Sequence, residues 1–165
     1  MTRQRLGAWG VALEDAGLDT ALVLEVINRT LDEDLSWGPD VTTGAIFGPS
    51  QRGRARVVSR QAGCLAGVPV AAAALHVLAD RNGDDVSTSI LISDGSRVRP
   101  GDAVLEIEAP LRTLLTAERT LLNLLGQLSG VATATAAWVD ALGNSGVHVR
   151  DTRITVPGLR VLQNY

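Results

Sequence analysis

The sequence predicts an α+β fold, in which helices accompany a small sheet and the chain ends in a strand, a loop and a helix. Apolar residues recur at helical spacing over 6–29 and over 113–142, and short alternating runs bounded by glycine lie between these segments. The last alternating run, 146–150, is followed by the polar residues 151–153 and then by Pro157, a typical first residue of a helix. This order is the first half of a βαβ unit.

The composition favours a packed core of small aliphatic side chains. Hydrophobic residues make up 45% of the 165 residues, which suffices for a core, whereas aromatic residues make up only 3%. The net charge of −3 and the isoelectric point near 5.3 argue against a nucleic-acid or membrane-surface binder, which needs a concentrated basic face. With no apolar run long enough to cross a bilayer and no signal-peptide pattern, the chain is expected to be cytoplasmic.

The ionisable residues restrict the kinds of reaction that the chain could catalyse. All 15 basic residues are arginine, so Schiff-base chemistry and lysine-linked prosthetic groups are excluded. Arginine offers a planar fork that suits carboxylates and phosphates. The single cysteine, Cys64, lies among small residues and is interpreted as part of the core rather than as a nucleophile.

The first forty residues predict two helices and a turn. The helical pattern of 6–29 breaks near Gly17, and Asp19 or Thr20 is a suitable cap for the second helix. The acidic run 32–34 is interpreted as solvated or capping, because three adjacent acids cannot converge on one cation. Residues 37–40 predict a turn.

The middle of the chain predicts a small antiparallel sheet. Strands are expected over 54–60, 63–67, 86–92 and 103–109. Arginines alternate along the first of them, which indicates the solvated face of a sheet, with a binding surface as the alternative. Between the strands, Pro69 opens a helix to Asp80, in which the isolated His76 is interpreted as structural.

The long helix over 113–142 carries a broad apolar face. Gly126 and the pair Ser129-Gly130 permit either a break in it or a close contact. Glu118 and Arg119 lie near its beginning. They are consistent with a surface ion pair, or with an arginine that projects toward an anion.

Three sequence blocks resemble one enzyme family. Residues 151–160 resemble the signature Asp-Thr-Arg-Lys-Thr-x-Pro-Gly-x-Arg of quinolinate phosphoribosyltransferase, the carboxylating nicotinate-nucleotide pyrophosphorylase of NAD synthesis. Residues 114–133 resemble its Leu-x-x-Glu-Arg-x-x-Leu-Asn and Leu-Ser-Gly-Ile-Ala-Thr motifs, and 33–43 resemble its Glu-Asp-Leu and Gly-Asp-Val-Thr motifs. Ile154 departs from the pattern, because the family has lysine there.

The resemblance implies the fold in more detail. It implies an α+β N-terminal sandwich domain with helices over 1–113. A linking helix and the first strand and helix of an incomplete α/β barrel would follow over 114–165. Family members continue well beyond this length, so the chain is interpreted as a truncated member that is inactive alone. A lone parallel strand cannot pair both edges, so residues 146–165 are expected to be poorly anchored.

The resemblance also implies the activity. Family members form nicotinate mononucleotide, CO2 and pyrophosphate from quinolinate and phosphoribosyl pyrophosphate, with Mg²⁺, whose ligands are not expected in this chain. Arg153 would bind a quinolinate carboxylate beside Thr152, and Arg119 would reach the same site from the partner subunit of a homodimer or larger assembly. Ile154 replaces a substrate-facing lysine, and in an otherwise intact site this replacement is expected to cost about a hundredfold or more in activity. No catalytic residue or metal ligand is assigned.

Two other interpretations remain open. The chain could be a non-catalytic dimerisation or regulatory module that pairs with a full-length paralogue through the helix around Arg119. It could also be a related pyrophosphorylase that acts on a different acid.

Overall fold

The computed structural model describes residues 7–165, so Leu6 of the first predicted helix lies outside the described residues. Helix α1 (Gly7–Asp15) and helix α2 (Thr20–Asp34) confirm the two predicted helices. Asp19 is the cap of α2, because its Oδ1 accepts hydrogen bonds from the backbone N–H groups of Ala21 at 2.9 Å and Leu22 at 3.2 Å.

A short third helix, α3 (Val41–Ile46), was not predicted. Asp40, the last residue of the predicted turn, is its N-cap, and its Oδ1 accepts a hydrogen bond from the N–H of Thr43 at 2.9 Å. A helix of this length gives little apolar periodicity, and its capping residue is the only local signal for it.

The main sheet has three antiparallel strands, β1 (Arg52–Val58), β5 (Ala103–Pro110) and β3 (Ser87–Ile90), in the order β1-β5-β3. A two-stranded sheet joins β2 (Gly63–Cys64) to β4 (Arg97–Val98). The register places Arg54 opposite Glu108 and Arg56 opposite Glu106, and these pairs form exposed ion pairs of 2.9 and 2.7 Å. The arginine face is therefore the solvated face of the sheet, as predicted.

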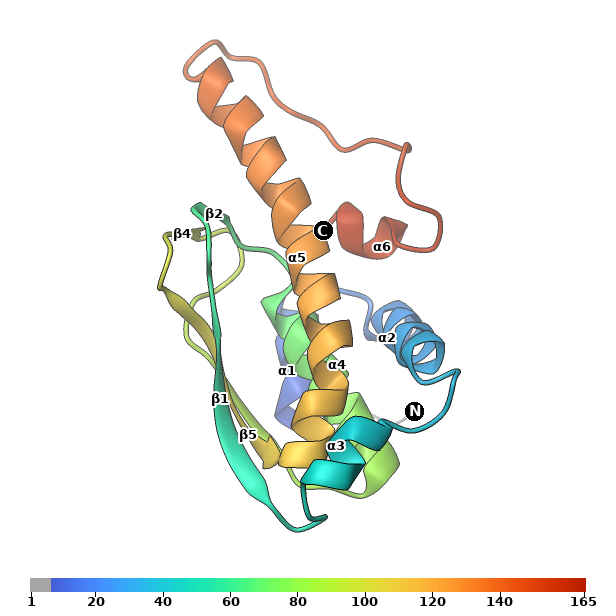
Figure 1. The fold of residues 1–165 in the computed structure, drawn as a ribbon. Helices are drawn as coiled ribbons and strands as arrows, with labels where there is room; N and C mark the ends of the chain where they lie inside the picture. The colour runs from blue at the N-terminus through green and yellow to red at the C-terminus, as the bar shows by residue number, and fades with distance from the viewer. Residues whose placement is uncertain (1–6) are drawn as a thin grey trace.

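Helices cover the other face of the sheet (Figure 1). Helix α4 (Val68–Asn82) lies at the centre and contacts α1, α2, α5 and two strands of the main sheet. Its alanines, Ala71–Ala74, are almost fully buried, and their small side chains let the neighbouring elements approach closely. Its His76 Nε2 lies 3.0 Å from Thr88 Oγ1 and its ring stacks on Trp9, which supports a structural role. Cys64 is buried, as predicted.

Helix α5 (Leu111–Leu142) is continuous for 32 residues, so the glycines within it do not break it. Close contact is found at Ser129 alone, whose Oγ lies 3.2 Å from the backbone N and from the carbonyl oxygen of Ala66, whereas a Cβ on Gly126 or Gly130 would meet no atom within 4 Å. The predicted domain boundary, between residues 113 and 114, falls inside this helix. In Figure 1 the C-terminal part of α5 extends beyond the sheets.

The last part of the chain differs from the prediction. The strand predicted over 146–150 does not form, and residues 147–150 are exposed and outside any β-ladder of the described chain. A local alternating pattern cannot make a strand without a partner. Helix α6 (Arg160–Gln163) begins three residues after Pro157. Its Leu162 is only 2% exposed, and α6 packs on α2 and α5, so this end is better anchored than expected.

Candidate functional site

Arg119 lies on α5 and points toward the C-terminal end of α2. Its Nη1 forms an ion pair with Oδ1 of Asp34 at 2.6 Å. The two side chains are exposed to very different extents, 73% for Arg119 and 17% for Asp34. The hydrogen bond to Asp34, together with the charge of that carboxylate, raises the pKa of Arg119. The guanidinium is thus held on one side and open to solvent on the other.

Asp40 adds a second carboxylate near this arginine. Its Oδ2 accepts hydrogen bonds from the hydroxyls of Thr43 at 2.5 Å and Thr116 at 3.3 Å, so it joins α3 to α5 one turn before Arg119. The hydroxyl and N–H of Thr43 stabilise the charged carboxylate and lower the pKa of Asp40. Segments 33–43 and 114–123, two of the blocks that carry the family resemblance, therefore meet around Arg119.

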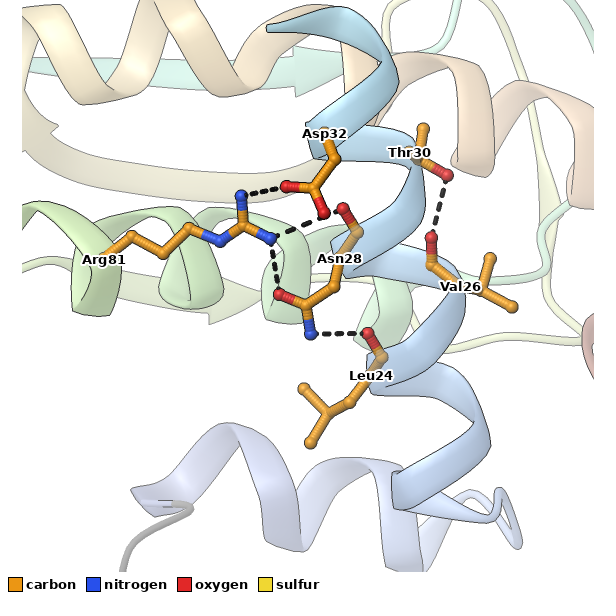
Figure 2. A network of polar contacts seen from close by, with 6 residues as sticks. All are labelled: Leu24, Val26, Asn28, Thr30, Asp32 and Arg81. Carbon is orange, nitrogen blue, oxygen red and sulfur yellow. Dashed lines mark hydrogen bonds and ion pairs between the residues drawn. The ribbon is translucent and has the colours of Figure 1, made fainter. Parts of the chain in front are cut away.

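A second arginine, Arg81, fixes the helix that carries Asp34. Arg81 of α4 contacts Asp32 Oδ1 at 2.7 Å and Asn28 Oδ1 at 2.6 Å, which ties the C-terminal half of α2 to α4 (Figure 2). The amide group of Asn28 in turn donates to the carbonyl of Leu24 at 2.8 Å. Asp32 and Asp34 each pair with an arginine, so the acidic run is not simply solvated, contrary to the prediction.

The other predicted site residues, Thr152, Arg153 and Ile154, lie in the exposed loop between α5 and α6. The backbone N–H of Ile154 donates to Thr152 Oγ1 at 3.1 Å, and Nη2 of Arg160 donates to the carbonyl of Arg153 at 3.0 Å. The Ile154 side chain is 91% exposed, so packing against the described residues does not account for an isoleucine at this position. Arg160, the last residue of the signature block, thus joins the two ends of the loop, a role that was not predicted from the sequence.

Thr152 lines a cavity of about 490 Å³ between α5 and the C-terminal segment, residues 146–165. Asp151, Arg97 and Tyr165 also line it, but Arg119 and Arg153 do not. The structure therefore brings Thr152, Arg153 and Ile154 together in one loop and leaves Arg119 in a separate cluster with Asp34 and Asp40. The meeting of these two groups across a subunit interface stays a prediction.

Two negative observations apply to residues 7–165. No helix there is both long enough and apolar enough to cross a membrane. No group of three or more His, Cys, Asp or Glu side chains in that range is placed to hold a metal ion.

Comparisons with known proteins agree on one family. The family model for the N-terminal domain of quinolinate phosphoribosyl transferase matches residues 40–129, and the model for its C-terminal domain matches residues 131–165. The nicotinate-nucleotide pyrophosphorylase (carboxylating) of Mycobacterium leprae is 44% identical over 154 residues, covering 93% of this chain and 52% of that protein. The human protein of that name is 37% identical over 120 residues, covering 72% and 37%.

Solved structures give the same picture. The crystal structure of NadC from Streptococcus pyogenes superposes with a TM-score of 0.81 at 36% identity, covering 88% of this chain and 50% of that one. The nicotinate-nucleotide pyrophosphorylase of Francisella tularensis superposes with a TM-score of 0.77 at 30% identity, covering 88% and 49%. The chain spans about half the length of most of the curated relatives it matches.

Proposed function

Since the chain belongs to the quinolinate phosphoribosyltransferase family, we propose that it serves quinolinate phosphoribosyl transfer, as a subunit that contributes Arg119 to a shared site. The reaction would form nicotinate mononucleotide, CO2 and pyrophosphate from quinolinate and phosphoribosyl pyrophosphate. One observation carries the proposal. Two of the three family-like blocks fold together around Arg119, and the Arg119 side chain that they hold is 73% exposed.

The chemistry of the substrates suits these side chains. Quinolinate carries two carboxylates and phosphoribosyl pyrophosphate carries several phosphate charges, and an arginine fork binds such groups with a defined orientation. Arg153 and Thr152 would bind a quinolinate carboxylate in one subunit. Arg119 would approach from a second subunit, so the proposal includes a homodimer or a larger assembly in the cytoplasm.

A requirement for Mg²⁺ belongs to the same proposal. The described residues offer no cluster of metal-binding side chains, so no residue of this chain is assigned to the ion. The steps proposed for this chain are therefore limited to the binding and orientation of anions by its arginines.

The experiment that tests the proposal uses a mixed assembly. The chain is co-expressed with the full-length Mycobacterium leprae relative in which the residue that aligns with Arg119 is replaced by alanine. We expect the purified mixed assembly to recover quinolinate phosphoribosyl transfer, because this chain supplies Arg119 to the relative's site. The chain with Arg119→Ala should give no recovery.

Arg153→Ala in this chain is the matched control. In the mixed assembly the relative supplies its own carboxylate-binding loop, so this change should leave the recovered activity intact. Co-purification without recovered activity would contradict the proposal and favour a non-catalytic module. Failure of the two proteins to associate would contradict the shared site.

A further inference from the structure

The ion pair between Asp34 and Arg119 is asymmetric. The acidic partner is largely buried at the end of α2, whereas the basic partner stands at the surface of α5. Because the Arg119 side chain is 73% exposed, the pair contributes little to folding stability. Its main physical effect is to restrict the guanidinium, since one of the five N–H donors is fixed by a short charge-assisted hydrogen bond of 2.6 Å.

The position of Asp34 is itself rigidly determined. Arg81 clamps the last turns of α2 through Asp32 and Asn28. Arg119 belongs to the long helix α5, which packs on both α2 and α4. Donor and acceptor thus come from helices with fixed relative positions, which is the arrangement needed to hold a binding group in one orientation.

Simple electrostatics gives the opposite expectation for anion binding. The carboxylates that face Arg119 are Asp34 at the end of α2 and Asp40, the N-cap of α3, and both would repel an anionic substrate. If Asp34 acted only through its charge, its removal would strengthen the binding of quinolinate. If Asp34 acts by orienting Arg119, its removal would weaken that binding. The sign of the effect separates the two roles.

We infer that Asp34 is a positioning residue for Arg119, which fixes one side of the guanidinium and directs its remaining donors toward the carboxylate of an aromatic dicarboxylic acid. The inference rests on the proposed function, because it assigns the ligand of Arg119 from it. In this role Asp34 touches no substrate and acts only through its ion pair with Arg119.

The test uses the mixed assembly described above, with Asp34→Ala and Asp34→Asn introduced into this chain. We expect Asp34→Ala to raise the KM for quinolinate about three- to tenfold, with a smaller change in kcat. The reason is that Arg119 would remain but would no longer be held in the orientation that binds quinolinate. Asp34→Asn should have a weaker effect, since the amide oxygen still accepts a hydrogen bond. Melting temperatures of the variants should change little.

Glu33→Gln is the matched control, because it removes an exposed carboxylate beside Asp34 that forms no ion pair among the described residues and leaves the clamp between Asp32 and Arg81 intact. It should leave the KM for quinolinate unchanged. A KM that stays the same or falls in Asp34→Ala, while Arg119→Ala abolishes recovery, would overturn the positioning role alone. Recovery that survives Arg119→Ala would overturn the proposed function first.

A second measurement does not depend on activity. In the 165-residue chain, nitrogen-15 relaxation of the Arg119 side chain should show a restricted guanidinium that becomes mobile in Asp34→Ala. Equal mobility in both proteins would contradict the inference.

Discussion

The ionisation of Tyr165 can be used to measure whether the C-terminal segment is docked on the rest of the chain. Tyr165 is the only tyrosine in the sequence, so its signal is unambiguous. Its hydroxyl donates to Asp94 Oδ2 at 3.0 Å, and the same carboxylate accepts from the N–H groups of Gly67 and Val68 at the beginning of α4. Burial, followed by the charge and hydrogen bond of Asp94, raises the pKa of Tyr165 to about 12. The ionisation of tyrosine, followed by ultraviolet absorbance, should therefore have its midpoint near pH 12 instead of pH 10.

The sign of the effect on stability follows from this shift. A raised pKa stabilises the folded state fully below pH 10, and the contribution is lost as the pH rises from 10 toward 12. Asp94→Asn should lower the midpoint, because it removes the negative charge that opposes ionisation. A midpoint near pH 10 in the folded protein, with circular dichroism unchanged, would show that Tyr165 is not docked.

Individual residues of the candidate site were only partly predictable from the sequence. Arg119 and the loop residues 152–154 were found through motifs, which record local order along the chain. Asp34 and Arg81 were missed as partners because their ion pairs join residues 85 and 49 positions apart. Such pairs depend on how helices pack, and a local pattern carries no information about that packing.

At the scale of elements, the contact between α4 and α5 depends on Gly67. Its φ of +87° is strained for any residue with a side chain, and a Cβ there would lie 2.5 Å from Leu128 Cδ1. We expect Gly67→Ala to lower the free energy of unfolding by about 2–5 kcal/mol, combining the left-handed conformation with overpacking. Urea denaturation measures this change.

Gly126→Ala provides the comparison for that substitution. Gly126 lies within α5, and a Cβ there would meet no atom within 4 Å. Alanine should therefore stabilise the helix by about 0.5–1 kcal/mol. Equal effects of the two substitutions would show that α4 and α5 do not approach as closely as described.

Elements were predictable where their pattern was long or alternating. The alternation of arginine with small apolar residues in β1 predicted both the strand and its solvated face, since side chains of a strand alternate between faces. Helix α3 was missed because six residues give little periodicity. The strand at 146–150 was wrong because strand formation requires a partner, which the pattern of a single segment does not include.

At the scale of the whole molecule, α5 connects two parts with different packing. One face of its first half is buried, mainly against α4, whereas the segment that follows it is exposed and returns to the body near its end, at α6 and Tyr165. Arg29 of α2 donates to the carbonyl of Gly158 at 3.0 Å, and Leu162 enters the core. The C-terminal segment is therefore expected to be anchored at its end and loose in its middle.

Amide hydrogen exchange tests this distribution directly. The N–H groups of residues 162–164 donate to the carbonyls of Leu159 and Arg160 at 2.9–3.1 Å, so they should exchange slowly, whereas residues 148–151 lie exposed outside any ladder and should exchange fast. Leu162→Ala should remove the protection of 162–164, lowering the free energy of local opening by about 2 kcal/mol or more. Ile154→Ala, a change of a side chain 91% exposed, should leave it intact. Fast exchange throughout 146–165 would contradict the docking of α6. It would instead support the expectation from the sequence that this whole segment is poorly anchored.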